Sequence, residues 1–367
     1  MRTIYITFIG FLMFSCVSKK NSPTVDAIHE YASTYFPSNE PGGAILIMKG
    51  DSIIFSEGYG VADLVTKEPI TPKTLFNLGS ISKTFVANAI LILQERGRLS
   101  VEDSLLKYFP EFKNKSIASK VKIKHLLTHS SGLPDNRHVN DDTVFYLTAK
   151  DYENWYPETQ VDALEFEPGS RFEYSNPAFN GLALIVEKVS GMPWQRFVEE
   201  NIFRPSGMKA STITNEPHPD KGVSHGYILN HGQWIEDDYG EEPTFAAAGN
   251  GGVWSSVEEL VLYERAHRKA IFLNPETIDD ARTIKRFSNW SSEAQPFIGW
   301  SWFITEQGGK HMVGHPGSQG GFLTNYIVIP EKEILLVILC NAPREEYEMK
   351  NLTTYILEQI GQQNWYE

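Results

Sequence analysis

The sequence predicts an α+β fold with one sheet built from both ends of the chain. Short runs rich in β-branched and aromatic residues occur near the N-terminus and again in the last quarter of the sequence. Between them, apolar residues recur at helical spacing and long loops separate the helices. We therefore expect distant segments to share a sheet, with a helical lobe inserted at about residues 77–250.

The expected strands are bounded by turn residues. "GGAILIMKGDSIIFSEGYG" predicts two strands joined by a turn at residues 49–51. A helix is expected after about Ser255, followed by a second set of strands in "FIGWSWFIT", "HMVGHPG", "FLTNYIVIP" and "EILLVILCN". A helix over about residues 345–360 closes the pattern.

The expected helices of the middle region carry recognisable ends. Residues 81–95 form one helix, and Gly97 suits its C-terminal cap. Ser100 is predicted to cap the next helix, with acidic residues in the first turn. "IKHLLTHSSGLP" predicts a short helix broken by glycine and proline. "NPAFNGLALIVEKVSG" predicts an amphipathic helix closed by Gly191.

Composition excludes one class of partner. The chain has 367 residues and a net charge of −13. Phosphate binding needs clustered lysine and arginine, and no basic stripe is present, so we expect no nucleic-acid partner. The expected partner is a small-molecule or peptide substrate, and the expected state is a monomer.

The N-terminus reads as a targeting segment. Arg2 precedes an apolar run over residues 4–14, which is too short to span a bilayer comfortably but suits a signal peptide. Ser15-Cys16 after the run resembles a bacterial lipobox, which makes residues 1–15 the signal peptide and Cys16 the lipidated residue. The alternative is a conventional signal peptide with an incidental cysteine.

Two consequences follow from that segment. We expect export to the periplasm or cell envelope and a lipid anchor in the membrane, with residues 16–40 as linker and N-terminal helix. The other cysteine, Cys340, ends the run "ILLVILC" and is expected to be a small core residue without a disulfide partner.

Ser80 and Lys83 form the first candidate catalytic pair. In "FNLGSISKTF", Ser80 stands where a helical pattern begins and Lys83 follows one turn later on the same face. Amides and the dipole at a helix start favour an alkoxide and later an oxyanion. A lysine whose pKa is lowered by burial can take the serine proton. The alternative is an N-cap serine followed by a solvated lysine.

A second stretch, "FEYSNPAF", places Tyr174 and Asn176 two residues apart. Their side chains face the same way if this segment is extended. A tyrosine near a lysine can shuttle a proton between nucleophile and leaving group. Asn176 can orient the lysine or accept a substrate N–H. The alternative is a loop tyrosine followed by a helix-capping asparagine.

A third stretch, "VGHPGSQGGF", interrupts a strand pattern at His315 and Gly317. Small residues let a substrate backbone lie close along a strand edge. His315 can contact the substrate or donate to the tyrosine, and the N–H of Ser318 can face that of Ser80 as a second oxyanion donor. The alternative is a glycine-rich turn with an exposed histidine.

In this order the three stretches resemble the S-x-x-K, Y-x-N and third motifs of the serine β-lactamase and penicillin-binding-protein superfamily. The Y-x-N form resembles that of class C β-lactamases and their esterase and D-peptidase relatives. "IKHLLTHSSGLP" and "AGNGGVWSSVEEL" are also similar to that family. The resemblance runs over about residues 41–341, which we take as the catalytic domain, with residues 342–367 as the C-terminal helix of its α/β lobe.

The resemblance implies a β-lactamase/transpeptidase-like fold, in which helices flank an antiparallel sheet and an all-helical lobe faces it across the active site. It implies Ser80 as the acylated nucleophile, Lys83 and Tyr174 as a base and acid pair, and Asn176 as the orienting residue. The acylation base is disputed in studied members, so the role is not divided between Lys83 and Tyr174.

The same resemblance implies substrate binding by His315, Gly317 and Ser318, without metal or organic cofactor. His315 departs from the K-T-G motif of class C β-lactamases, whose lysine helps to hold the β-lactam carboxylate. Histidine is not a permanent cation near neutral pH. H-x-G forms resemble those of D-aminopeptidases, some D,D-peptidases and esterase-like members.

We therefore expect a serine hydrolase that acts on an ester or amide through an acyl-serine intermediate, as an esterase or D-amino-acid peptidase does. A class C-type β-lactamase and a non-catalytic penicillin-binding sensor are the alternatives. A metallohydrolase is a weaker one: His125 and His129 have a spacing that zinc sites use, but no H-E-x-x-H motif or third ligand is evident.

The segment "HVNDDTVFYLTAKDYENWYPETQ" is expected to form one wall of the cleft. Trp155 and Tyr156 within it can stack on a substrate or pack against the protein. We expect packing.

Overall fold

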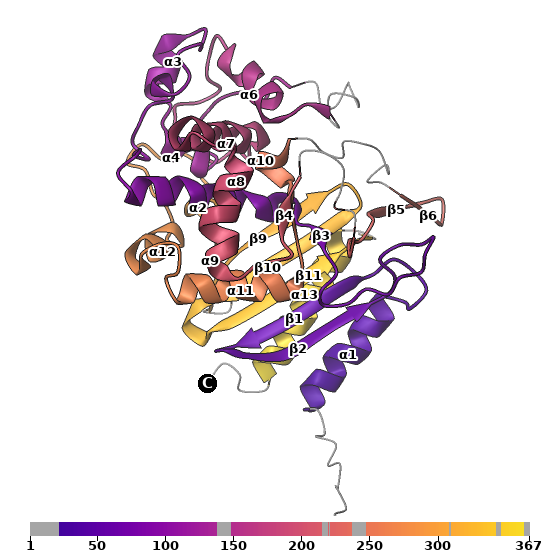
Figure 1. Ribbon diagram of the computed structural model, residues 1–367. Helices are drawn as coiled ribbons and strands as arrows, with labels where there is room; N and C mark the ends of the chain where they lie inside the picture. The colour runs from indigo at the N-terminus through magenta and orange to yellow at the C-terminus, as the bar shows by residue number, and fades with distance from the viewer. Residues whose placement is uncertain are drawn as a thin grey trace, which may run out of the picture.

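The computed structural model of the chain describes residues 22–137, 148–214, 219, 221–236, 247–307, 310–342 and 346–362. Its centre is a six-stranded sheet of order β2-β1-β11-β10-β9-β8, in which all neighbouring strands are antiparallel. The sheet joins the two ends of the chain because β1 pairs with β11 (Figure 1). The predicted α+β class, with an antiparallel sheet built from distant segments, is confirmed. The strands are β1 (Gly43–Lys49), β2 (Ser52–Tyr59), β8 (Phe303–Gln307), β9 (Lys310–Gln319), β10 (Phe322–Ile329) and β11 (Ile334–Cys340).

Helices cover both faces of this sheet. Strand alternation directs Ile45 and Ile47 of β1 toward α1 (Pro23–Tyr35) and α13 (Glu346–Gln362), which pack together on one face. Leu46 of the same strand faces the opposite core, where α11 (Val257–Arg268) contacts β1 and β11. β11 is buried on both faces, as its unbroken apolar run predicts.

Apart from the short segment η4, which joins β10 to β11, the remaining helices gather beyond α11, on the side of the sheet away from α1 (Figure 1). Among them, α2 (Ser82–Glu95) is buried from Ser82 to Leu93, which makes it the central helix of the region. The other helical elements are η1 (Gly79–Ile81), η2 (Leu105–Lys107), α3 (Lys115–Lys120), α4 (Ile123–Leu127), α6 (Asp151–Thr159), α7 (Asn176–Ser190), α8 (Trp194–Val198), η3 (Glu199–Phe203), α9 (Arg204–Ser206), α10 (Ala248–Gly251), α12 (Pro275–Ala281) and η4 (Pro330–Lys332).

Two small sheets complete the described structure. β3 (Phe76–Asn77), β7 (Val253–Ser255) and β4 (Thr212–Ile213) form one of them, with β7 in the middle. β5 (Tyr227–Asn230) and β6 (Gln233–Glu236) form a hairpin. The first sheet matters for the site, because β3 leads directly into η1 and α2.

Most element predictions are confirmed, but the strand expected in "FIGWSWFIT" begins only at Phe303 and the helix expected after Ser100 is wrong. α7 ends at Gly191 in the left-handed conformation, as its sequence predicts. No helix begins after Ser100: the chain makes a turn and then the 3₁₀ segment η2. The Oγ of Ser100 accepts the N–H of Glu102, and the Asp103 carboxylate accepts the N–H of Ser100. These local bonds stabilise a turn in place of a helix.

The cysteine and targeting predictions have different outcomes. Cys340 is buried at the end of β11, as expected of a core residue. The signal peptide, the lipobox and Cys16 lie outside the described residues. Within the described ranges, no helix has both the length and the apolarity to cross a membrane.

Candidate active site

Ser80 lies in η1, where the chain passes from β3 into the buried helix α2. The side chain of Asn77 accepts the N–H of Gly79 at 2.7 Å, and Thr324 Oγ1 donates to the carbonyl of Leu78 at 2.9 Å. Gly79 has a φ of 52°, and a Cβ at this position would lie 2.8 Å from the nitrogen of Ser318. Glycine is therefore needed here twice, for its conformation and for the close approach to β9.

Lys83 follows one turn later and is completely buried. Its Nζ lies 3.0 Å from Ser80 Oγ and 2.7 Å from the backbone oxygen of Asn250, to which it donates. Burial lowers the pKa of Lys83 well below 10.5, and the charge of Arg137 lowers it further. A neutral amine that donates to Asn250 retains a lone pair for the Ser80 proton.

The carbonyl of Asn250 is held in place by a network of buried side chains. The side-chain amide of Asn250 donates to Asn180 Oδ1 at 3.1 Å, and Asn180 in turn donates to Asp151 at 2.6 Å. Asp151 also accepts the N–H of Gly249 at 2.8 Å and the indole N–H of Trp194 at 2.9 Å. Burial raises the pKa of Asp151 to about 6, although these three donors favour its ionised form.

Tyr174 approaches Ser80 from the segment that precedes α7. Its hydroxyl donates to Ser80 Oγ at 2.8 Å, and Lys83 Nζ lies 5.2 Å from the centre of its ring. Burial raises the pKa of Tyr174 to about 12, against a smaller opposing effect of the Ser80 hydrogen bond. Ser175 caps α7 by accepting the N–H of Ala178, so that Asn176 becomes the first residue of the helix.

The C-terminal half of β9 supplies the other wall. β8 pairs with β9 up to the Phe303–Gly314 pair, so the β8 side of residues 315–319 has no ladder partner among the described strands. Gly317 approaches η1 closely, because a Cβ there would lie 2.1 Å from the carbonyl oxygen of Leu78. An open strand edge beside Ser80 can accommodate an extended substrate, as the small residues of this stretch predict.

His315 is almost fully buried beside this edge. Its Nδ1 lies 2.6 Å from the carbonyl oxygen of Pro316, and its Nε2 has no hydrogen-bond partner in the described structure. Burial lowers the pKa of His315 to about 3. The side chain is therefore neutral at physiological pH. It makes no hydrogen bond to Tyr174 among the described contacts.

A cavity of about 450 Å³ opens over these groups. Its described lining contains Ser80, Tyr174, Asn176, Phe303, His315, Pro316, Gly317, Ser318 and Leu323. No lysine or arginine belongs to that lining. The described part of the cavity wall thus combines a candidate nucleophile, candidate proton-transfer groups and a strand edge, without a lysine or arginine.

The structure therefore brings together the seven candidate catalytic and substrate-binding residues named from the sequence, which are Ser80, Lys83, Tyr174, Asn176, His315, Gly317 and Ser318. Asn176 lines the cavity, but no hydrogen bond joins it to Lys83 in the described structure. The group that orients Lys83 is the carbonyl of Asn250, which sequence reasoning missed. The stretch "AGNGGVWSSVEEL", which contains Asn250, is similar to the family, but its sequence does not predict this contact. A backbone oxygen is present in every residue, so residue type gives no signal for it.

The two histidines weighed as zinc ligands have other partners. The Nδ1 of His125 accepts the N–H of Lys122, and the Nδ1 of His129 accepts the N–H of Ser175. His125 packs against Phe287, whereas His129 stacks on Tyr174. Among the described residues, no group of three histidine, cysteine or acidic side chains could hold a metal ion.

The segment predicted as a cleft wall is only partly described, because residues 138–147 lie outside the described ranges. Trp155 is fully buried against Phe109 and Gly181, so its predicted packing role is confirmed. Tyr156 is 43% exposed and lies beside Tyr152. Neither Trp155 nor Tyr156 lines the cavity over Ser80.

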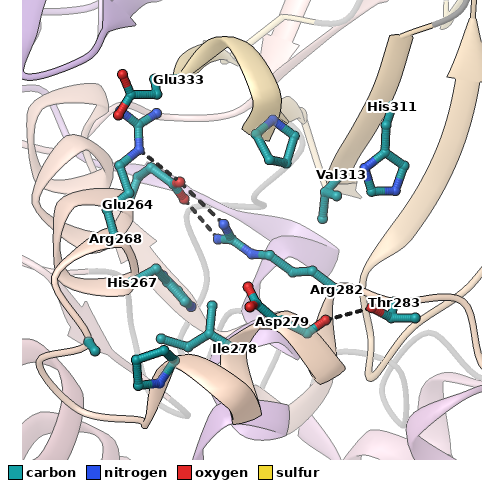
Figure 2. Close-up of a pocket in the computed structure, with 13 residues that line it drawn as sticks. Glu264, His267, Arg268, Ile278, Asp279, Arg282, Thr283, His311, Val313 and Glu333 are labelled. Atoms are coloured by element: carbon teal, nitrogen blue, oxygen red, sulfur yellow. Dashed lines mark hydrogen bonds and ion pairs between the residues drawn. The ribbon is translucent and has the colours of Figure 1, made fainter.

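A second cavity, of about 480 Å³, lies toward the other end of β9 (Figure 2). Glu264 at its wall accepts two hydrogen bonds from Arg282, one from Arg268 and one from the hydroxyl of Tyr326. Burial alone would raise the pKa of Glu264, but the positive charge and hydrogen bonds of Arg282 outweigh it and hold the pKa at about 2. This cluster ties α11 to the segment after α12 and to β10. It contains no nucleophile with a base.

Comparison with known proteins adds independent support. A family model described as Beta-lactamase matches residues 33–360. Penicillin-binding protein 4* of Bacillus subtilis (strain 168) is 29% identical over 329 residues, which cover 83% of this chain and 69% of that protein. Protein flp of Staphylococcus aureus (strain MW2) is 27% identical over 83% of this chain, which spans 60% of flp. The Beta-lactamase of Escherichia coli (strain K12) is 25% identical over 82% of this chain and 84% of that protein.

Solved structures show the same fold. The octameric penicillin-binding protein homologue from Pyrococcus abyssi superposes with a TM-score of 0.76 at 26% identity, covering 88% of this chain and 74% of the homologue. The D-amino acid amidase from Ochrobactrum anthropi SV3 gives a TM-score of 0.78 at 22% identity, covering 94% of this chain and 100% of the amidase. The predicted β-lactamase/transpeptidase-like architecture is confirmed.

Proposed function

Because the chain belongs to the Beta-lactamase family, a family of serine hydrolases, we propose that it hydrolyses an ester or amide through an acyl-serine intermediate. One observation carries the proposal. Ser80 Oγ lies 3.0 Å from the Nζ of a buried lysine without a carboxylate partner among the described residues, and 2.8 Å from the Tyr174 hydroxyl. A serine is activated by such a neutral base within hydrogen-bonding distance.

The proposed reaction has two halves. As Ser80 Oγ attacks the carbonyl carbon of the substrate, its proton passes to the Lys83 and Tyr174 pair, and the carbonyl oxygen becomes an oxyanion. The backbone N–H groups of Ser80 and Ser318 are the proposed donors to that oxygen. The tetrahedral intermediate collapses, the leaving group takes the proton, and water then hydrolyses the acyl-serine with the same pair as base.

The cavity favours substrates that carry no carboxylate opposite His315. Its described lining has no lysine or arginine, and His315 is neutral at physiological pH. We therefore place neutral esters and amides, including D-amino-acid amides or peptides, ahead of β-lactams. A β-lactam carries an anionic carboxylate, which a neutral imidazole attracts less strongly than an ammonium group does.

The test uses the full-length chain and a short-chain p-nitrophenyl ester. Ser80→Ala should abolish both turnover and the mass increase of an acyl adduct in the intact protein. Ser82→Ala is the matched control, because Ser82 is a buried neighbour whose side chain accepts the N–H of Val253 and has no described hydrogen bond to Ser80, Lys83 or Tyr174. Turnover that survives in Ser80→Ala would refute the proposal. A wild type that forms a stable adduct without turnover would instead favour the penicillin-binding sensor.

We also propose that the protein is exported and anchored through a lipid on Cys16. The support is the sequence pattern of the first 20 residues, which lie outside the described structure. Membrane fractionation of cells that express the wild type or Cys16→Ser tests it. Equal membrane association of both forms would refute the anchor.

A further inference from the structure

His129 is held in a conformation that few side chains adopt. It follows α4, has a φ of 51° and is 1% exposed. Positive φ is uncommon for residues other than glycine, although histidine, asparagine and aspartate tolerate it best. Such a backbone persists only where the surrounding structure holds it, so the contacts of His129 indicate what the conformation serves.

The backbone on both sides of Tyr174 is tied to this one residue. The N–H of Glu173 donates to the carbonyl oxygen of His129 at 2.7 Å. The N–H of Ser175 donates to His129 Nδ1 at 3.0 Å. The residue that precedes Tyr174 and the residue that follows it are therefore both fixed relative to His129.

The ring of His129 also contacts Tyr174 directly. The two ring centres are 4.3 Å apart and the planes differ by 25°, which is a stacked arrangement. Phe179 and Phe172 lie against His129 at 5.1 Å and 5.7 Å between ring centres and limit its movement. Tyr174 has two side-chain torsions, and a stacked neighbour restricts both of them.

We propose that His129 is a positioning residue, which holds the Tyr174 hydroxyl at hydrogen-bonding distance from Ser80. This inference rests on the proposed acyl-serine mechanism. It assigns His129 no proton transfer, since neither ring nitrogen has a described hydrogen bond to Ser80, Lys83 or the Tyr174 hydroxyl. Its contribution is geometric, and a displacement of about 1 Å in such a group can cost on the order of 100-fold in rate.

The protonation state of His129 suits this role. Burial lowers its pKa well below 6.5. The ring therefore stays neutral near neutral pH, and Nδ1 keeps the lone pair that accepts the N–H of Ser175. A protonated ring would lose that acceptor and place a cation beside Lys83.

His125 provides a matched control on the same segment. It is 6% exposed, its Nδ1 accepts the N–H of Lys122 at 3.1 Å, and its ring packs against Phe287. Asparagine places an oxygen near the position of Nδ1. His129→Asn and His125→Asn therefore remove the same ring and can keep the same kind of hydrogen bond, but only the first loses a contact with Tyr174.

The experiment measures kcat, KM and Tm for the full-length wild type, His129→Asn, His129→Ala and His125→Asn with a p-nitrophenyl ester. We expect His129→Asn to lower kcat by about 10- to 100-fold with KM within about twofold of the wild type. His129→Ala should be slower still, because it also loses the acceptor for Ser175. His125→Asn should keep kcat within about twofold of the wild type, while its Tm falls by about as much as the Tm of His129→Asn.

The outcomes separate this inference from the proposed function. Equal kcat values for His129→Asn and His125→Asn would overturn the positioning role while wild-type turnover still supports the acyl-serine mechanism. A fall in kcat that follows the loss of folded protein in both variants would also overturn it. An inactive wild type would argue against the acyl-serine mechanism. In that case a measurement of thermal stability tests whether His129 holds Tyr174.

That measurement needs no turnover. Thermal unfolding is followed for His129→Asn, Tyr174→Ala and the double variant. We expect the Tm shifts to be non-additive by about 2 °C, the size of one lost aromatic contact in a protein of this length. Additive shifts would show that His129 does not hold Tyr174 and would overturn the inference.

Discussion

Each of the two cavities along β9 has a buried ionisable group at or directly behind its wall, but the two groups have different partners. Near the C-terminal end of β9, Lys83 is completely buried. Its partners are neutral: Ser80, the Asn250 carbonyl and the Tyr174 ring. Near the N-terminal end of β9, Glu264 is equally enclosed but faces Arg282 and Arg268. Burial lowers the pKa of Lys83 well below its usual value, whereas Arg282 keeps Glu264 ionised.

The difference lies in the partners more than in the depth of burial. A buried charge persists where opposite charges and hydrogen bonds replace water, and it is neutralised where they do not. The paired cluster keeps its charges and joins parts of the fold. The unpaired lysine gives up its charge and thereby gains a lone pair that can accept a proton. The perturbed pKa of Lys83 is therefore an indicator of function, whereas that of Glu264 reflects structure.

The largest effect is expected at Lys83. Lys83→Met should lower the rate of Ser80 acylation by about 10²- to 10⁴-fold, the usual contribution of a positioned base. The same variant should be more stable by about 1 kcal/mol, since folding at neutral pH no longer has to deprotonate a buried amine. Rapid-quench mass spectrometry measures the first quantity and urea unfolding the second. Near-wild-type acylation would contradict the assignment.

Glu264→Gln should have the opposite pattern. It leaves Arg282 and Arg268 without a counter-ion in a buried place, which typically costs about 3–5 kcal/mol of unfolding free energy. The acylation rate of the folded fraction should stay within about threefold of the wild type. Urea unfolding compares it with Glu258→Gln, a half-buried carboxylate on the same helix α11 that should lose less than about 1 kcal/mol. Equal losses would mean that the cluster is not structural.

The pairing of Glu264 also predicts an acid limb of stability. Its pKa in the folded chain is about 2, below the ordinary 4.5, so its contribution is present above pH 4.5 and is lost as the pH falls from 4.5 toward 2. The loss should be about 3 kcal/mol, at roughly 1.4 kcal/mol for each pH unit. Urea unfolding measures the free energy of unfolding at pH 3 and pH 6. The decrease from pH 6 to pH 3 should be smaller in Glu264→Gln than in the wild type. An unchanged difference would assign the acid limb to other carboxyl groups.

The smallest effect is expected at His315. His315→Lys adds an ammonium group to a cavity wall that has no described lysine or arginine. Acylation by an anionic β-lactam should rise by about tenfold relative to acylation by a neutral ester, which corresponds to about 1.4 kcal/mol. The ratio of the two second-order rate constants is the readout. A ratio unchanged from the wild type would show that charge at this position does not select the substrate.

Much of the molecule was decided by the sequence alone. The unbroken apolar run of β11, the capped pattern of α7 and the turn between β1 and β2 predict their elements, because side-chain burial and capping act over neighbouring residues. The spacing of Ser80 and Lys83 also predicts their contact, since residues three apart share a helix face. The incorrect prediction of a helix after Ser100 shows where such local patterns fail. There, hydrogen bonds between side chains and the neighbouring backbone favour a turn.

Tertiary structure alone decided the electrostatic character of these groups. The carbonyl of Asn250 that accepts from Lys83 is 167 residues away in the chain, and Ser175, whose N–H reaches His129, is 46 residues away. Neither partnership can be read from residue type, because a backbone group is the same in every residue. Whether a buried lysine is a charge or a base depends on which distant groups surround it, and packing alone determines those groups.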